Sequence, residues 1–326
     1  MLEDEVLKTI QRYNMIQMDD LVVVAVSGGP DSMTLLNILL NLKNKLKCEI
    51  IVAHVNHMIR AVADAETAYV KEFCDKHEIK CYIKKINVIK KAELEKISTE
   101  EAGRNARYDF FAEVLKNTNA TKIAIAHNKN DNAETVLMNV IRGSGVSGLK
   151  GIEPVRDKII RPLIEIDRKS IEQYCIEQNL NPKFDESNKE NIYTRNKIRN
   201  LLIPYLEKEF NPSIIDSINR LSDLAAQENR YIEKIVNENF INIKENENSN
   251  SVELNLKKFN VLDLFIRSKI ILLCIKKIFG NTKGIEKKHI QDVIKLCENN
   301  IGNKYLTPNK NLKIAVHKGR ILISKI

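Results

Sequence analysis

The chain has 326 residues, of which 43% are hydrophobic and 29% are charged, the balance of an ordinary globular protein with room for two domains. No apolar run approaches the ~20 residues that span a bilayer. The acidic start, Met1–Glu5, lacks the basic-then-apolar order of a signal peptide. We therefore expect a cytoplasmic protein that makes no membrane contact.

The net charge of +9 is unevenly distributed along the chain. Residues 248–326 carry 16 Lys and Arg against 5 Asp and Glu, a net of +11, and the other 247 residues carry a net of −2. Such an asymmetry favours a polyanionic partner, most often a nucleic acid, with a merely solvated basic surface as the alternative.

The segment 22–42 predicts a phosphate-binding turn. Val22–Val26 is a β-branched run typical of a strand buried on both faces, and Met33–Leu42 has the apolar face of a helix. Between them lies Ser27-Gly28-Gly29-Pro30-Asp31-Ser32, in which the glycines permit a tight turn. The helix N-terminus offers free N–H groups and a positive dipole end, which bind anions.

This turn is not a Walker A loop, because no Gly-Lys-Ser/Thr follows the glycines. It resembles the pyrophosphate loop, Ser-Gly-Gly-x-Asp-Ser, of the N-type ATP pyrophosphatases. Members of that superfamily cleave ATP between the α and β phosphates and transfer AMP to a substrate oxygen. A glycine turn that binds nothing is the alternative interpretation.

Strand and helix patterns alternate through the first two thirds of the chain. Further strands are expected at Cys48–His54, Lys80–Ile86 and Lys122–His127, and helices at Ala65–Glu78, Glu100–Lys116 and Asn132–Arg142. This order predicts an α/β fold with a doubly wound parallel sheet and ligands at the carboxyl ends of the strands.

Two further polar motifs begin where predicted strands end, so they should share a crevice with the loop. The motif His54–Arg60 suggests nucleotide contacts. In the second motif, Asp131 and Glu134 stand three residues apart at a helix start, where they either cap the helix or bind an ammonium group. The glycine-rich stretch 142–149 is either a mobile loop over this site or an ordinary linker.

Two arginine pairs have helical spacing. Arg104 and Arg107 are three residues apart, and Arg195 and Arg199 are four apart, so each pair shares one helix face. The first pair either clamps phosphates or forms surface ion pairs with Glu100 and Glu101. The second pair either contacts RNA or lies on an exposed helix face.

The remainder of the chain suggests a second domain. Helices are expected at Asp167–Asn179, Thr194–Phe210, Ser213–Asn239, Leu262–Ile278 and Lys287–Glu298, with a polar loop at Lys244–Ser251 and a hairpin around His317–Arg320. We predict a catalytic domain over residues 1–212 and a smaller, mainly helical and basic domain over 213–326. The six cysteines form no Cys-x-x-Cys pair and no zinc-ligand pattern.

Seven motifs follow one another along the chain: Ser27–Ser32, His54…Arg60, Glu101-Ala102-x-Arg104-Asn105-Ala106-Arg107-Tyr108, Asp131…Ala133-Glu134-Thr135, Arg142-Gly143-Ser144-Gly145, Arg161-Pro162-Leu163, and Asp185-Glu186-Ser187-Asn188…Arg195-Asn196-x-Ile198-Arg199. Together they resemble the tRNA(Ile)-lysidine synthetase family over roughly residues 20–210. The basic part that follows resembles that family's first C-terminal domain. The second C-terminal domain of longer members is expected to be absent.

The resemblance implies an adenine nucleotide α-hydrolase-like, Rossmann-like fold and a specific ligation. ATP, with Mg²⁺, adenylates C2–O of the wobble cytidine in an isoleucine tRNA with a CAU anticodon, and L-lysine displaces AMP to form lysidine.

The resemblance also implies roles for individual residues. ATP would be bound by Ser27, Gly28, Gly29, Pro30, Asp31, Ser32, His54 and Asn56. Mg²⁺ would be held by Asp31, and the lysine ammonium groups by Asp131 and Glu134. The residues expected to take part in catalysis are Asp31, Arg107, Asp131 and Arg195, the two arginines by stabilising charge around the AMP-linked intermediate.

The segment 127–131 departs from the family pattern and lacks one of its carboxylates, and two other functions compete. Members often have His-His-x-Asp-Asp where this chain has His127-Asn128-Lys129-Asn130-Asp131, which leaves the role of position 130 open. A related tRNA thiolase would need paired cysteines that this chain lacks. A non-catalytic RNA-binding protein would not require Asp31 or both serines. The sequence leaves open whether the chain forms a homodimer.

Overall fold

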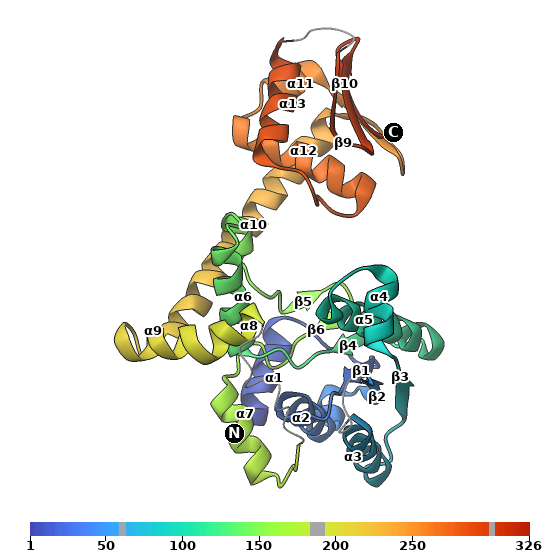
Figure 1. The fold of residues 1–326 in the computed structure, drawn as a ribbon, viewed down its shortest axis with the longest axis vertical. Helices are drawn as coiled ribbons and strands as arrows, with labels where there is room; N and C mark the ends of the chain where they lie inside the picture. The colour runs from blue at the N-terminus through green and yellow to red at the C-terminus, as the bar shows by residue number, and fades with distance from the viewer. Residues whose placement is uncertain (59–62, 183–192, 300–303) are drawn as a thin grey trace. The chain divides into compact units, whose positions relative to one another are not determined.

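A computed structural model describes residues 1–58, 63–182, 193–299 and 304–326, which form two compact units, Met1–Ala226 and Gln227–Ile326 (Figure 1). The first unit contains the predicted α/β sheet, and the second combines helices with an antiparallel sheet. The predicted domain limits, 1–212 and 213–326, lie close to this division. They remain a prediction, because the helix α10 (Ile214–Ile243) contributes residues to both units.

The sheet of the first unit has six strands in the order β3-β2-β1-β4-β6-β5. All neighbouring pairs are parallel except β5 with β6 at the edge. The strands are β1 (Leu21–Ala25), β2 (Glu49–Asn56), β3 (Cys81–Lys85), β4 (Lys122–Ala124), β5 (Val155–Arg156) and β6 (Ile159–Ile160). The order reverses direction between β1 and β4, where a parallel α/β sheet binds its ligands.

Helices cover both faces of this sheet, so the predicted doubly wound α/β fold is confirmed. Val22 and Val24 of β1 belong to a core shared with α1 (Leu2–Arg12), α2 (Pro30–Leu46) and α7 (Arg168–Glu177), whereas Val23 packs with Phe110 of α5 (Thr99–Thr118). Alternate residues of a strand point to opposite faces, so a strand covered on both sides must be apolar throughout. The other helices of the unit are α3 (Ala63–Lys76), α4 (Val88–Glu95), α6 (Lys129–Ile141), the short η1 (Val146–Gly148), α8 (Thr194–Lys197), η3 (Ile198–Leu202) and α9 (Ile203–Glu209).

The segment expected to form one helix over Thr194–Phe210 is interrupted. A π-helical turn, η3, lies between α8 and α9, and it comes just before Pro204. Proline has no N–H to bond the carbonyl of Asn200 four residues earlier, and its ring crowds that carbonyl. The helix widens there, and π-helical turns of this kind are often found at functional sites.

The second unit is built around a five-stranded antiparallel sheet in the order β7-β8-β11-β10-β9. Its elements are β7 (Lys244–Glu247), β8 (Ser251–Asn255), α11 (Leu256–Asn260), α12 (Leu264–Phe279), α13 (Lys287–Asn299), β9 (Tyr305–Asn309), β10 (Leu312–His317) and β11 (Arg320–Lys325). The predicted hairpin is confirmed: Lys318 and Gly319 both have positive φ, as a two-residue type I′ turn requires.

The prediction of a loop over Lys244–Ser251 is wrong in part, because this segment contains the strand β7 and the turn into β8. β7 lies at the edge of the sheet and is mostly exposed, so it needs no apolar residues and its sequence looks like a loop. β8 instead buries Val252 and Leu254 on one face. Among the residues that the structure describes, no helix has the length and apolarity needed to cross a membrane.

The core of the first unit depends on complete packing around α2. Leu35→Ala removes a side chain with no exposed surface, so the variant should lose about 2–5 kcal/mol of unfolding free energy through lost burial and a residual cavity. Leu94→Ala, at a position 75% exposed, is the matched control and should cost well under 1 kcal/mol. Denaturant unfolding of both variants measures the difference, and equal losses would contradict the packing described.

Candidate active site

The predicted pyrophosphate loop lies between β1 and α2, and its backbone passes close to a neighbouring helix. Gly28 has φ +92°, a left-handed conformation that favours glycine, and an added Cβ would lie 3.5 Å from Val70 and 3.6 Å from Glu66 of α3. Pro30 opens α2, where its missing N–H costs nothing. The free N–H groups of the first turn of α2 therefore face the loop.

Two serines hold the loop in shape. Ser27 N–H donates to Ser32 Oγ (3.1 Å), and Ser32 Oγ donates to the Gly29 carbonyl (3.0 Å). The two hydroxyl oxygens also lie 3.1 Å apart. Residues 27–32 are therefore brought together as one preformed turn at the end of β1.

Asp31 joins this loop to the start of α6. Asn128 Nδ2 donates to Asp31 Oδ1 (3.0 Å). Burial raises the pKa of Asp31 to about 6, the carboxylate of Asp131 adds to the rise, and Arg168, the Asn128 bond and Arg199 oppose it. The loop carboxyl thus lies among charged groups from three separate parts of the chain.

The structure places His54 and Asn56 inside the protein, each only 2% exposed. His54 Nδ1 lies 2.9 Å from the Val26 carbonyl, so it donates, and His54 Nε2 lies 3.0 Å from Thr67 Oγ1. Asn56 Nδ2 donates to the Ala63 carbonyl at 3.1 Å. These groups fix the start of the loop and the start of α3, and their direct contact with nucleotide remains a prediction.

Asp131 and Glu134 both lie buried in the first turns of α6. Asn128 and Asp131 form a capping box: Asn128 Oδ1 accepts from Asp131 N–H, and Asp131 Oδ2 accepts from Asn128 N–H, both at 3.0 Å. Glu134 is 1% exposed. The helix dipole favours both carboxylates at this position, and the ion pairs described next supply the rest of the compensation.

Three arginines surround these two carboxylates. Arg168 Nη2, Arg195 Nη2 and Arg199 Nη2 lie 3.2, 3.1 and 3.2 Å from Asp131 Oδ1. Arg195 Nε lies 2.8 Å from Glu134 Oε2, and Arg199 Nε lies 2.6 Å from Glu134 Oε1. Arg168 at the start of α7 carried no sequence signal, because only the tertiary packing of α7 beside α6 brings it here.

The structure also assigns a contact to Asn130, which replaces an aspartate of the family pattern. Asn130 Oδ1 accepts from the backbone N–H of Arg168 (3.0 Å). A carboxylate oxygen could accept the same bond, so asparagine preserves this link between α6 and α7.

A second group of arginines gathers around His127 and Tyr108. Arg161 Nε donates to His127 Nδ1 (3.1 Å), which leaves the ring proton of the neutral imidazole on Nε2. Burial and then the cations Arg161, Arg195, Arg107 and Arg104 lower the pKa of His127 to about 3. The guanidinium carbons of Arg104 and Arg156 lie 5.3 and 5.9 Å from the centre of the Tyr108 ring.

Arg107 belongs to this second group and has no ion-pair partner among the residues that the structure describes. Among the described residues it forms no ion pair or hydrogen bond, although its side chain reaches solvent. Desolvation by surrounding protein, with the nearby cations Arg104 and Arg195, lowers the pKa of its guanidinium. An excess of positive charge in one place favours a bound anion such as a phosphate.

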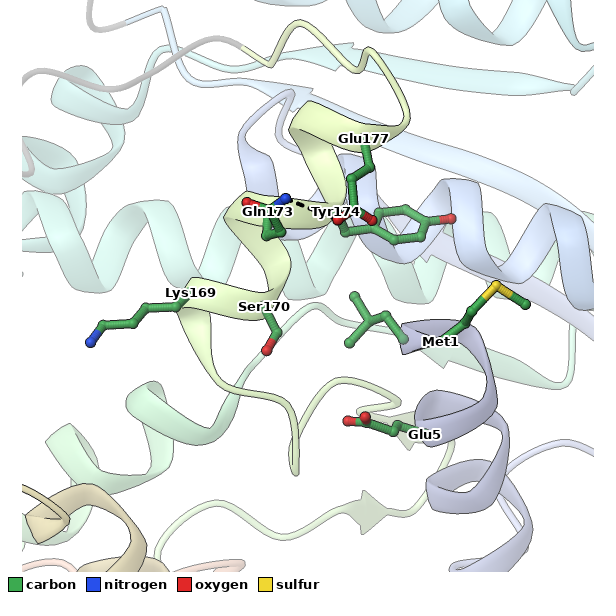
Figure 2. Close-up of a pocket in the computed structure, with 8 residues that line it drawn as sticks. Met1, Glu5, Lys169, Ser170, Gln173, Tyr174 and Glu177 are labelled. Carbon is green, nitrogen blue, oxygen red and sulfur yellow. Dashed lines mark hydrogen bonds between the residues drawn. The ribbon is translucent and has the colours of Figure 1, made fainter.

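Some of the predicted site residues, and one cavity, are not part of the site described above. Arg60 and the motif Asp185–Asn188 fall outside the described residues. A cavity of about 540 Å³ lies between the start of α1 and one side of α7, lined by Met1, Leu2, Glu5, Lys169, Ser170, Gln173, Tyr174 and Glu177 (Figure 2). None of the predicted site residues lines that cavity.

Comparison with known proteins supports this architecture. The PP-loop domain family matches residues 2–206. In its fold, this chain is similar to the U34-tRNA thiolase NcsA of Methanococcus maripaludis. That comparison has a TM-score of 0.58 at 22% identity and covers 69% of this chain and 78% of NcsA.

Three clostridial proteins named tRNA(Ile)-lysidine synthase are much more similar in sequence. The protein of Clostridioides difficile is 43% identical and covers 99% of this chain, that of Clostridium acetobutylicum is 46% identical and covers 94%, and that of Clostridium tetani is 43% identical and covers 98%. The chain spans 71%, 66% and 68% of their respective lengths. With its PP-loop domain and these relatives, the chain belongs to the tRNA(Ile)-lysidine synthase family.

Proposed function

We propose that this protein joins L-lysine to C2 of the wobble cytidine in an isoleucine tRNA with a CAU anticodon, consuming ATP and releasing AMP and pyrophosphate. The observation that carries the proposal is the juxtaposition of Asp31 in the pyrophosphate loop with Asp131 and Glu134 in α6. Asn128 bonds to both Asp31 and Asp131, so ATP-activating and amine-binding groups share one site. The names of the relatives point to the same reaction.

The first step is the adenylation of the cytidine. The C2 carbonyl oxygen attacks the α-phosphorus of ATP, and the bond to the bridging oxygen of the β-phosphate breaks. The N–H groups at the start of α2, together with Ser27 and Ser32, hold the departing pyrophosphate. The product carries AMP on the C2 oxygen, which is then a good leaving group.

Asp31 is suited to bind Mg²⁺ in this step. Burial and Asp131 disfavour its negative charge, and a divalent cation offsets that cost. Mg²⁺ is commonly held by one carboxylate and the phosphates of the substrate, which matches the donors present here. When bound, the ion neutralises the phosphate charge that develops as pyrophosphate leaves.

The second step replaces AMP with lysine. The ε-amine attacks C2, the C2–O bond breaks, and AMP departs with the oxygen. Asp131 and Glu134 hold the ammonium charge of the substrate, and Arg107 and Arg195 stabilise the phosphate of the departing AMP. A free lysine amine has a pKa of about 10.4, so it must lose a proton before it attacks.

The basic second unit supplies the tRNA-binding surface in this proposal. Its lysines neutralise backbone phosphates, a contribution that weakens as salt increases. The first unit has the phosphate-holding and amine-holding groups, so the two units divide the work between chemistry and RNA binding.

The direct test is ligation. The full chain, given ATP, Mg²⁺ and radiolabelled lysine, should label an unmodified isoleucine tRNA with a CAU anticodon and not one with a GAU anticodon. Glu134→Gln should lower labelling by roughly a hundredfold or more because it removes a charge expected to hold the substrate. Glu165→Gln, at an acid paired with Arg12 elsewhere in the unit, should leave labelling near the wild-type rate. Transfer of sulfur instead of lysine would overturn the proposed function.

A second test concerns Asp31. Asp31→Asn keeps the shape and should abolish AMP release while tRNA binding survives. It should also stabilise the metal-free protein at pH 8 by roughly 2–3 kcal/mol, because the raised pKa means that ionising Asp31 costs folding energy.

The gain from Asp31→Asn should depend on pH in a defined direction. The wild-type protein keeps the full stability of a protonated Asp31 below pH 3.8 and loses it as the pH rises through about 6. Unfolding curves of both proteins in EDTA should therefore converge toward pH 4. A gain that is constant from pH 4 to pH 8 would rule out the raised pKa.

A third test addresses the basic unit. Replacing Lys257, Lys287 and Lys288 with Gln should weaken tRNA binding and reduce its dependence on salt by about one counter-ion for each phosphate that the lysines no longer neutralise. The matched control replaces Lys8, Lys47 and Lys116, which are also exposed but lie in the first unit. Filter binding across a salt series measures both sets, and equal effects would refute the assignment of RNA binding to the second unit.

A further inference from the structure

Each oxygen of the two carboxylates proposed to bind lysine already accepts at least one hydrogen bond. Asp131 Oδ2 accepts from Asn128 N–H, and Asp131 Oδ1 lies within 3.2 Å of three guanidinium groups. Glu134 Oε1 accepts from Arg199 Nε at 2.6 Å, and Glu134 Oε2 accepts from Arg195 Nε and Arg199 Nη2, both at 2.8 Å. An ammonium group can reach these oxygens only if a guanidinium leaves.

Displacement by lysine alone is unfavourable. Glu134 is 1% exposed, and a bidentate arginine fork is a stronger partner for a carboxylate than a single ammonium. Two cations beside each other would also repel. In the nucleotide-free protein, free lysine therefore competes poorly with Arg195 and Arg199 for the same oxygens.

A triphosphate held at the pyrophosphate loop would change this balance, because Asp31 of that loop lies near two of the same arginines. Arg168 and Arg199 are close enough to Asp31 of the pyrophosphate loop to oppose the rise in its pKa. Three arginines share the two carboxylates of α6. Phosphates held at the loop offer these guanidinium groups a second set of oxygen acceptors.

The backbone that carries Arg199 is suited to such a movement. Arg199 lies in the π-helical turn Ile198–Leu202, where the N–H of Ile203 bonds to the carbonyl of Ile198. A π-helical turn differs from a regular helix by one inserted residue, and closing it rotates the preceding residues about the helix axis. Arg195 and Arg199 could therefore turn away from α6 together.

We propose that Arg195 and Arg199 form a latch that closes the lysine site until nucleotide phosphates draw the two side chains away. This inference rests on the proposed function, since it assumes that lysine binds at Asp131 and Glu134. Its consequence is an order of binding: nucleotide first, lysine second.

The latch makes a thermodynamic demand. If nucleotide strengthens lysine binding by a given factor, lysine must strengthen nucleotide binding by the same factor. A ligand that treats the open and closed forms alike shifts nothing, so the phosphates must interact more strongly with the open arginines.

The wild-type protein provides the decisive measurement. Equilibrium dialysis of radiolabelled lysine against the full chain, with and without Mg²⁺ and α,β-methylene-ATP, gives the two dissociation constants. We expect lysine to bind at least about tenfold more tightly with the nucleotide analogue, and the analogue to gain the same factor from lysine. Equal lysine affinity in both conditions, or no lysine binding in either while labelling of tRNA proceeds, would overturn the latch and leave the proposed function standing. Absence of tRNA labelling would overturn the proposed function itself.

Variants of Arg199 distinguish a side chain that blocks the lysine site from one that shapes the lysine pocket. Arg199→Gln should strengthen lysine binding in the absence of nucleotide and bring the ratio of the two dissociation constants toward one. Arg12→Gln, which breaks the exposed pair with Glu165, should keep the wild-type ratio. If Arg199→Gln weakens lysine binding in both conditions, the arginine shapes the pocket and the latch is wrong. Thermal unfolding checks that each variant is folded, and Arg195→Gln replaces Arg199→Gln if the latter is not.

Discussion

The burial of two carboxylates side by side in α6 is the constraint on which the site depends. Removing an ionised carboxylate from water costs several kcal/mol, and Asp131 and Glu134 would each raise the cost for the other. The capping box and the helix dipole provide part of the compensation. The rest comes from guanidinium groups on α7, α8 and the π-helical turn, so these elements are held against α6 by charge as well as by packing.

The parallel sheet fixes the positions of the elements that carry these groups. Because β1 and β4 are neighbouring parallel strands, the pyrophosphate loop and the start of α6 leave the sheet at the same edge. Asn128 then needs only its short side chain to connect Asp31 with the capping box of α6. Behind the loop, His54 bonds the Val26 carbonyl and fixes the point at which the backbone turns.

Charge sorts the groups of the first unit into two sets. The acids of α6 face arginines that can exchange partners, whereas the cations around His127 include Arg107, which has no counter-ion among the described residues. Opposite charges suit opposite parts of the proposed reaction: an amine that must be held and phosphates that must be stabilised as they leave. Both sets include Arg195, which pairs with Glu134 and lowers the pKa of His127.

The sequence by itself determined the features that are local. The apolar run before Ser27–Ser32 predicted a strand buried on both faces, the order of elements predicted the parallel sheet, and the spacing of Asp131 and Glu134 placed both acids at one helix start. Only the tertiary structure showed that Arg168, Arg195 and Arg199 occupy those acids, that Asn130 bonds the start of α7, and that His54 and Asn56 are buried. These contacts join residues far apart along the chain. A local sequence pattern does not predict the π-helical turn that contains Arg199. Nor does it predict which partner a charged side chain contacts once distant helices pack together.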